Sequence, residues 1–371
     1  MKKLYGTTVP IITPFDEEGK VDVESLKKLT DHVIDNGLSC LYPNGTTGEM
    51  LLLSVEERKL VSETVVRQAA GRVPVFVHAG AMNLADTLEL AKHAVEIGAD
   101  GIGVVTPSYF KLSDRALADY YIQVANSVPQ DFSVYLYAIP QNAVNDINVS
   151  VAEQVAAACP NVVGLKYSFP NMSLLQQFML IRDETFSVLV GPDELFHVVC
   201  AAGGEGTVSG NAQVIPEHYA ALWAAIQSGD NEKARKLQRK TNVLNNILCA
   251  KNNIASYKVV LREEGVIKTA HMRAPMEELT REEEVALMKT LKEHNYRTCL
   301  LYTSNCRMLQ ERCRTASGWR QASLILSHRS TSVKRRKRPW MTGLQSILPY
   351  RELKLCGKLS QKILLRDWEK K

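Results

Sequence analysis

Residues 73–105 read VPVFVHAGAMNLADTLELAKHAVEIGADGIGVV, and this stretch decides the fold class. Two β-branched runs, Val73–His78 and Gly101–Val105, flank a segment of helical period from Asn83 to Ile97. Asn83 is a typical residue to begin a helix, and Gly98 is a typical residue to end one. The stretch therefore predicts a strand, a helix and a second strand, which is the crossover unit that joins parallel strands.

The strand and helix pattern recurs along the chain, at intervals of roughly 30 residues. Eight such units predict a closed (β/α)8 barrel, an α/β fold, rather than an open doubly wound sheet. No Gly-rich dinucleotide-binding motif follows the first predicted strand, where Pro10 and Pro14 stand instead, and this also disfavours the open sheet. The predicted strands are Thr8–Ile12, Leu38–Tyr42, Val73–His78, Gly101–Val105, Ser133–Tyr137, Val162–Lys166, Ser187–Val190 and Gly206–Ser209.

Further helical periods lie between these strands and after the last of them. Asp22–Asn36, Ser54–Ala70 and Ser113–Ser127 are predicted to cover the barrel, each with a capping residue at its start. We assign residues 1–228 to the barrel and residues 229–297 to a small C-terminal helical region packed on it. The three helices predicted there are Asp230–Leu248, Asn253–Glu264 and Thr280–His294.

The charge of the chain changes sign near Arg297. Residues 298–371 contain 17 Lys or Arg and 4 Asp or Glu, a net charge of +13. Residues 1–297 contain 28 basic and 36 acidic residues, a net charge of −8. The net charge of +5 for the whole chain therefore describes neither part, and residues 298–371 are predicted to be a basic tail outside the fold.

Two interpretations of this tail are open. The run KRRKR at residues 334–338, together with three tryptophans, could bind nucleic acid, which would make the protein a binding protein on a non-catalytic barrel. Alternatively, the tail is a non-native extension, because residues 299–304, CLLYTS, resemble the translated linker sequence found at junctions in assembled environmental libraries. We favour the second interpretation and expect no nucleic-acid partner.

Other features indicate a cytoplasmic enzyme without membrane contact. No stretch of about eighteen uncharged apolar residues occurs, and Gly6, Thr7 and Thr8 interrupt the N-terminus before a secretory segment could form. The cysteines of residues 1–297 stand far apart at positions 40, 159, 200 and 249. We expect them to be reduced and mostly buried, and we predict no metal ion and no separate cofactor.

The reacting groups of a barrel enzyme lie at the carboxyl ends of the strands. The sixth predicted strand, Val162–Lys166, ends in a lysine, which is unusual because parallel strands are buried on both faces. Burial favours a neutral lysine amine, and a neutral amine attacks keto groups. Lys166 is therefore the first catalytic candidate, although a lysine here could also extend into water or pair with a carboxylate.

Other strand ends offer polar side chains. Tyr137 ends the fifth strand, where a phenol can carry a proton between substrate and solvent, or can simply fill the barrel rim. Thr46 and Thr47 lie between Gly45 and Gly48 after the second strand, where backbone amides and hydroxyls can hold a small carboxylate or can form only a turn with a helix cap. His78 ends the third strand and could line the mouth of the barrel.

Three motifs, in their order and spacing, resemble a known family. They are Gly45-Thr46-Thr47-Gly48-Glu49, Tyr137 with Pro140 three places on, and Gly164-Leu165-Lys166. Over about residues 4–295 the chain resembles the N-acetylneuraminate lyase and dihydrodipicolinate synthase family of pyruvate-dependent class I aldolases. The resemblance implies a (β/α)8 barrel with a small helical region, a keto-acid substrate and a homotetramer.

The resemblance also implies roles for individual residues. Lys166 matches the lysine that forms the Schiff base, Tyr137 matches the tyrosine that moves the proton, and Thr46 and Thr47 match the loop that holds the pyruvate carboxylate. Tyr109 matches a second tyrosine, which in synthases comes from the neighbouring subunit to complete a Thr–Tyr–Tyr relay. Val208, at the end of the eighth strand, falls where a backbone group lies beside bound pyruvate.

One departure from the family pattern and one further similarity bear on the substrate. Synthases carry an arginine five residues after the catalytic tyrosine to bind the carboxylate of an amino-aldehyde, and this chain has Asn142 there. An amide supplies neither the charge nor the two-pronged hydrogen bond of arginine. The segment Gly191-Pro192-Asp193-Glu194-Leu195-Phe196 is similar to the one with which sialate lyases hold sugar hydroxyls, although the two carboxylates could instead cap the next helix.

We therefore predict a lyase that cleaves or forms a 2-keto-3-deoxy sugar acid or an N-acetylneuraminate-type substrate, with pyruvate and an aldehyde as the other partners in the reaction. Synthesis of 4-hydroxy-tetrahydrodipicolinate is the alternative that Asn142 disfavours. Dehydration of a keto acid through the same Schiff base is a further alternative.

Overall fold

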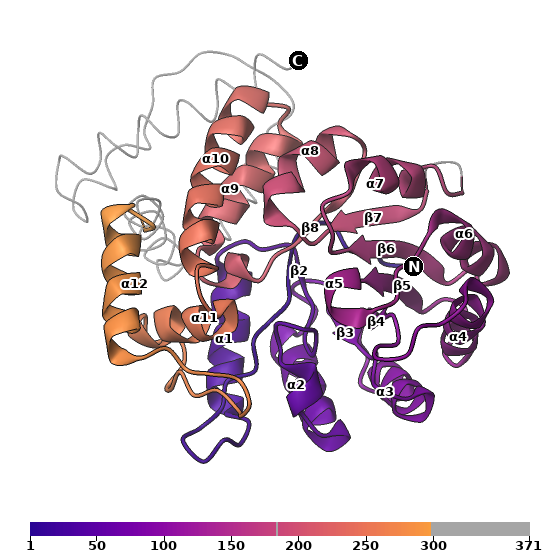
Figure 1. The fold of residues 1–371 in the computed structure, drawn as a ribbon, viewed down its shortest axis with the longest axis horizontal. Coiled ribbons are helices and arrows are strands. Elements are labelled where there is room, and N and C mark those ends of the chain that lie inside the picture. The colour runs from indigo at the N-terminus through magenta and orange to yellow at the C-terminus, as the bar shows by residue number, and fades with distance from the viewer. Residues whose placement is uncertain (183–184, 298–371) are drawn as a thin grey trace, which may run out of the picture. The chain divides into compact units, whose positions relative to one another are not determined.

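The computed structural model describes residues 1–182 and 185–297 (Figure 1). Within them, eight parallel strands pair in the order β2-β1-β8-β7-β6-β5-β4-β3. A parallel bridge between Leu41 and Val75 joins the two ends of this order and closes the sheet into a barrel. The predicted (β/α)8 barrel and C-terminal helical region are confirmed, whereas the basic tail at residues 298–371 lies outside the described residues.

The strands match the predicted ones but are shorter at some ends, and proline explains two of the differences. β1 ends at Val9 instead of Ile12 because Pro10 has no N–H to donate to a neighbouring strand. β3 begins at Phe76 instead of Val73, after Pro74, for the same reason. The observed strands are β1 Gly6–Val9, β2 Cys40–Leu41, β3 Phe76–His78, β4 Gly101–Val105, β5 Ser133–Ala138, β6 Val162–Tyr167, β7 Ser187–Val190 and β8 Gly206–Val208.

Helices cover the outside of the barrel, and polar residues begin many of them. The side chains of Asp22, Ser54, Asn83 and Ser113 each accept a backbone hydrogen bond in the first turn of the helix that follows. The helices of the barrel are α1 Val23–Asp35, α2 Val55–Ala69, α3 Leu84–Glu96, α4 Asp114–Asn126, α5 Pro140–Ala143, α6 Val149–Ala158, α7 Met172–Met179, α8 Phe196–Ala201 and α9 Pro216–Gln227. Short 3-10 helices lie at Met50–Leu52, Asp193–Leu195 and Asn211–Gln213.

Side chains fill the interior of the barrel, so it is a packed core below the site. Tyr42, Phe76 and Tyr135 are the largest members of this cluster, and all three are fully buried. A Cβ atom on Gly103 would collide with the Tyr42 hydroxyl, and one on Gly164 would collide with the Tyr135 ring. Glycine at these two strand positions therefore makes room for the interior tyrosines.

Three more helices follow the barrel: α10 Asn231–Leu248, α11 Asn253–Glu263 and α12 Arg281–Glu293. α10 packs against α8, α9, α11 and α12, and Figure 1 shows α10 and α12 on the side of the barrel away from α4 and α6. The division between a barrel and a C-terminal region at residues 228 and 229 stays a prediction. Of the helices in the described residues, none has the length and apolar composition needed to span a membrane.

Candidate active site

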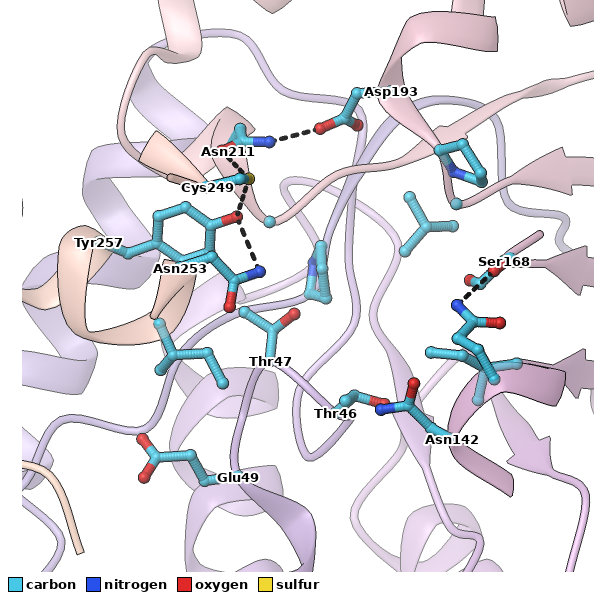
Figure 2. Close-up of a pocket in the computed structure, with 18 of the residues that line it drawn as sticks. Thr46, Thr47, Glu49, Asn142, Ser168, Asp193, Asn211, Cys249, Asn253 and Tyr257 are labelled. Atoms are coloured by element: carbon cyan, nitrogen blue, oxygen red, sulfur yellow. Dashed lines mark hydrogen bonds between the residues drawn. The ribbon is translucent and has the colours of Figure 1, made fainter. Parts of the chain in front are cut away.

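A cavity of about 750 Å³ lies at the carboxyl ends of the strands. Its base is formed by residues that end strands or follow them, among them Thr46, Tyr137, Lys166 and Val208. Its outer wall comes from the C-terminal helical region. Figure 2 shows the labelled side chains of both groups around the same space.

Lys166 lies near the end of β6, one residue before Tyr167 ends the strand. Its side chain is buried, and its Nζ lies 3.9 Å from the centre of the Tyr137 ring and 5.2 Å from the centre of the Tyr42 ring. Among the described residues, no carboxylate lies within ion-pair distance of this Nζ. The amine therefore faces aromatic rings and the cavity, with space beside it for a keto group.

Tyr137 on β5 is the direct partner of Lys166 in the pairing of β5 with β6. The phenol oxygen of Tyr137 lies 3.1 Å from the Thr46 hydroxyl, so either group can donate a hydrogen bond to the other. The backbone carbonyl of Tyr137 accepts hydrogen bonds from the Thr106 N–H and the Tyr121 hydroxyl. Amine, phenol and threonine hydroxyl are thus adjacent in one cluster at the base of the cavity.

The loop with the two threonines is held at three points. Asn44, with a left-handed φ of 63°, donates from its side chain to the Arg58 carbonyl and to the Ser62 hydroxyl on α2. The Thr13 hydroxyl donates to the Gly48 carbonyl. Glu49 forms a buried ion pair with Lys258 on α11. The side chains of Thr46 and Thr47 are partly exposed to the cavity between these fixed points.

Val208 and Asn142 also line the cavity. Val208 ends β8 and is buried. Asn142 lies on the short helix α5, where its amide side chain is exposed. Figure 2 shows Asn142 beside Thr46. The sequence-predicted candidates from four different strand ends are therefore brought to one space.

Asp193 and Glu194 both line the cavity but differ in burial. The Asp193 carboxylate accepts hydrogen bonds from the side-chain amides of Asn211, at 2.6 Å, and Asn245, at 3.4 Å. Burial raises the pKa of Asp193 to about 6, against the opposing effect of hydrogen bonds such as the one from Asn211. Glu194 is exposed, and its side chain is therefore the one of this pair that a bound molecule can reach from the cavity.

The outer wall contains residues that the sequence analysis did not single out. They are amide, thiol and phenol groups of α10, α11 and the segment between them, such as Asn245, Cys249, Asn253 and Tyr257. Cys249 is exposed, contrary to the expectation of mostly buried cysteines, whereas Cys40 and Cys159 are buried. The cysteine lies near the Asn211 amide and the Tyr257 hydroxyl, as Figure 2 shows.

Two predicted residues lie elsewhere. Tyr109 is 77% exposed, stacks edge-on against Phe110 and does not line the cavity of this single chain. His78, which the sequence offered as a candidate residue of the mouth, is fully buried and does not line the cavity. Arg58 donates to the His78 carbonyl, and the Val105 N–H donates to the His78 ring. The imidazole therefore packs inside the barrel wall, edge-on to the Tyr137 ring. Burial lowers its pKa and keeps the ring neutral.

Within the described residues, no group of three or more His, Cys, Asp or Glu side chains has the arrangement of a metal site. Among the described residues that line the cavity, Lys166 is the one basic side chain. The remaining lining is made of hydroxyl, amide, carboxylate, thiol and apolar groups.

Comparison with known proteins identifies the class of protein that has this fold and this site. The sequence profile of the dihydrodipicolinate synthetase family matches residues 3–294. A 4-hydroxy-tetrahydrodipicolinate synthase from Aquifex aeolicus is 34% identical over 290 residues, which cover 78% of this chain and 97% of the relative. An N-acetylneuraminate lyase from Mediterraneibacter gnavus is 30% identical over 302 residues, which cover 81% of this chain and 94% of the relative.

Solved structures give the same result. The crystal structure of a prophage protein of this family from Escherichia coli K12, in complex with pyruvate, superimposes with a TM-score of 0.75 at 27% identity, over 79% of this chain and 99% of that one. The chain therefore belongs to the dihydrodipicolinate synthetase family. It is a lyase of the pyruvate-dependent aldolase class, as the three motifs predicted.

Proposed function

We propose that this protein is a class I aldolase that cleaves a 2-keto-3-deoxy sugar acid, or an N-acetylneuraminate-type substrate, to pyruvate and an uncharged aldehyde. The observation that carries the proposal is the contact between three groups at the base of the cavity: the Lys166 amine, the Tyr137 phenol and the Thr46 hydroxyl. A nucleophile beside a hydroxyl pair that can relay a proton is what this reaction requires.

In the proposed reaction, the Lys166 amine in its unprotonated form attacks the keto carbon C2 of the substrate, and uptake of one proton from solvent lets water leave, which forms a protonated imine. Tyr137 takes the proton from the C4 hydroxyl as its own phenol proton passes to Thr46 and on to solvent, the C3–C4 bond breaks, and its electron pair moves into the imine to give an enamine and the aldehyde. A proton that returns through the same two hydroxyls is added at C3 of the enamine, and addition of water to the resulting imine then releases pyruvate, regenerates the amine and returns one proton to solvent. No external oxidant or reductant is needed.

The Gly45–Glu49 loop is the proposed site for the substrate carboxylate. Thr46 and Thr47 supply hydroxyl groups, and their loop supplies backbone N–H groups that suit a small anion. Val208, at the end of β8, also lines the cavity, and its backbone would lie beside the pyruvate part. Thr46 would then contact both the carboxylate and the proton-carrying Tyr137.

The rest of the cavity supports an uncharged, hydroxylated second part of the substrate. Its lining includes the amides of Asn142, Asn245 and Asn253, which both donate and accept hydrogen bonds. Glu194 is exposed there, and an ionised carboxylate accepts hydrogen bonds from sugar hydroxyls. A second carboxylate on the substrate would find no arginine at position 142.

A second candidate function is the synthesis of 4-hydroxy-tetrahydrodipicolinate, which uses pyruvate and an amino-aldehyde. The 34% identity to the Aquifex aeolicus synthase favours it, and Asn142 in the arginine position disfavours it. Dehydration of a keto acid through the same Schiff base on Lys166 is a third candidate. Neither this dehydration nor the aldolase reaction needs a metal ion or a separate cofactor.

A homo-oligomer, with a tetramer as the expected state, belongs to the same proposal. The exposed Tyr109 and its neighbour Phe110 support it, because two large aromatic side chains in water favour a contact with another chain. One solved relative is titled a monomeric dihydrodipicolinate synthase variant, so assembly is to be measured by sedimentation. We also propose a cytoplasmic enzyme without a nucleic-acid partner.

The test of the proposed function is pyruvate release from a panel of substrates. Wild-type protein is to be incubated with N-acetylneuraminate and with 2-keto-3-deoxy sugar acids, and pyruvate is to be followed with lactate dehydrogenase and NADH. We expect release from at least one of them and none with Lys166→Ala. Consumption of pyruvate with the amino-aldehyde, without release from any sugar acid, would favour the synthase instead.

A further inference from the structure

Glu49 and Lys258 form an ion pair that joins the carboxylate-binding loop to the C-terminal helical region. Lys258 Nζ lies 2.6 Å from Glu49 Oε1, and the two side chains are 0% and 1% exposed. Glu49 ends the loop that begins at Asn44, and Lys258 lies on α11. The sequence does not indicate that these two residues form a pair, because they are more than 200 positions apart.

The surroundings of Lys258 fix the position of its amine. Lys258 Nζ also donates to the His271 carbonyl at 2.9 Å and lies 4.2 Å from the centre of the Phe15 ring. Burial lowers the pKa of Lys258 and raises that of Glu49, and the attraction between them opposes both shifts. A buried ion pair of this kind adds little to stability, since desolvation of both charges offsets their attraction. Its geometric effect is therefore of more interest.

The geometry reaches Thr46 through the backbone. Glu49 has a left-handed φ of 61°, and its N–H donates to the Thr46 carbonyl at 3.0 Å. The side chain of Glu49 contacts Lys258 on α11, and its backbone closes the turn that contains Thr46 and Thr47. Figure 2 shows Glu49 and the two threonines along the same loop. A shift of the Glu49 carboxylate would thus change the conformation of this turn, and with it the position of the Thr46 hydroxyl relative to the Tyr137 hydroxyl.

Of the three fixed points of this loop, the ion pair is the one that leads outside the barrel. Asn44 is bound to α2, and Gly48 is bound to Thr13. α11 also carries Tyr257, the residue beside Lys258, whose ring lines the cavity. α11 therefore forms part of the outer wall of the cavity through Tyr257. It also contacts the loop at the base of the cavity through Lys258.

We propose that the Glu49–Lys258 pair is a positioning device by which α11 holds Thr46 and Thr47 in the orientation that binds the keto-acid carboxylate and supports Tyr137. The inference rests on the proposed function, because it concerns the same loop and the same substrate group. It assigns a role in catalysis to a helix that follows the complete barrel.

The test uses full-length protein and the double variant Glu49→Gln/Lys258→Met, which removes both charges and keeps both side chains about the same size. The matched control is Glu232→Gln/Lys236→Met, which removes an exposed pair of the same types on α10. Pyruvate binding is to be followed by the yield of borohydride-reduced Schiff base at increasing pyruvate concentrations. Turnover is to be followed on the best sugar acid, and folding by thermal unfolding.

We expect the double variant to fold and to form the Schiff base at saturating pyruvate. We also expect the pyruvate concentration for half-maximal trapping to rise at least tenfold and kcat to fall by roughly 10²-fold, since small misplacements of positioned groups have effects of this size. The control should match the wild type. Half-maximal trapping and kcat both within twofold of wild type would overturn the inference and leave the pair a structural contact.

A double variant that does not fold would shift the decision to Glu49→Gln alone, which keeps the shape of the side chain. Weaker pyruvate trapping in folded Glu49→Gln supports the inference, and unchanged trapping overturns it. Failure of the proposed function is distinguishable, because the wild type itself would then form no Schiff base on Lys166.

Discussion

Tyr137 and Lys166 are opposite each other in the pairing of β5 with β6, and the Lys166 amine lies 3.9 Å from the centre of the Tyr137 ring. The register of two neighbouring strands therefore sets the distance between the proposed nucleophile and the proposed proton carrier. Strand register is strongly specified in a barrel, since a slip of one strand by one residue would turn the side chains of that strand to the opposite face. The proposed catalytic pair is thus built into the sheet, and Thr46, in the loop that follows β2, reaches it from another strand end.

The first prediction concerns the Tyr137 hydroxyl. Tyr137→Phe should lower kcat for cleavage by about 10²- to 10⁴-fold, the usual contribution of a positioned acid or base. Schiff-base trapping with pyruvate should continue, because the Lys166 amine and the loop stay in place. The control is Tyr135→Phe. Tyr135 lies two positions before Tyr137 on β5, and its hydroxyl donates to the Ser187 hydroxyl. Equal loss of kcat in the two variants would contradict the role of Tyr137.

Much of this site could be predicted from the sequence, because the groups end strands. Lys166 interrupts an apolar strand, Tyr137 lies near the end of another, and the two threonines follow a third, so the fold alone brings them to one rim. The outer wall could not be predicted in this way. Cys249, Asn253 and Tyr257 reach the cavity only because α10 and α11 fold back over the barrel, and helix periodicity does not state which neighbour a helix will cover.

Neighbouring residues with similar chemistry are also hard to separate from sequence. Asp193 and Glu194 were predicted as a pair, yet the first is buried among amides and the second is exposed. His78 ends a strand as Lys166 nearly does, but hydrogen bonds with Arg58 and Val105 hold it in the wall. Such differences depend on contacts between residues far apart in the sequence.

The second prediction concerns Asn142 and the charge of the second substrate. Asn142→Arg should increase kcat/KM with a carboxylate-bearing amino-aldehyde by roughly tenfold or more, since a hydrogen bond to a charged group contributes about 1.5–3 kcal/mol. Cleavage of a sugar acid should weaken. Gln141→Arg places the same charge one residue earlier on the same helix and serves as the control. An equal gain in both variants would contradict a specific role for position 142.

The third prediction concerns Glu194. Glu194→Gln should raise KM for a sugar acid by about tenfold through loss of charge-assisted hydrogen bonds to its hydroxyls. Its pyruvate trapping and melting temperature should stay at wild-type values, because the Glu194 side chain is exposed and is not part of the cluster of Lys166, Tyr137 and Thr46. Glu205→Gln, an exposed position before β8, is the control. An unchanged KM would mean that sugar hydroxyls bind elsewhere in the cavity.

The fourth prediction concerns the pH dependence of stability. The pKa of Asp193 is about 6 in the folded protein, above its ordinary value, because the carboxyl is buried. The folded state therefore holds this proton more tightly than the unfolded state does. The stability that this residue contributes is fully present below the unfolded pKa and is lost as the pH rises through about 6.

Each unit by which the two pKa values differ corresponds to about 1.4 kcal/mol. Asp193→Asn should remove this contribution, so its unfolding free energy should fall less steeply between about pH 4 and 6 than that of the wild type. Urea unfolding at a series of pH values measures both curves. Parallel curves for the two proteins over this range would show that the Asp193 carboxyl is not the group responsible.

The central claim is that Lys166 is the amine that forms the Schiff base. The most direct measurement is reduction with borohydride in the presence of excess pyruvate, followed by peptide mass spectrometry of the full-length protein and of Lys166→Ala. The account predicts one reduced pyruvyl group on the peptide that contains Lys166 and no adduct in the variant. The claim would be contradicted if folded protein at saturating pyruvate yielded only an unmodified Lys166 peptide, or if the adduct lay on another lysine.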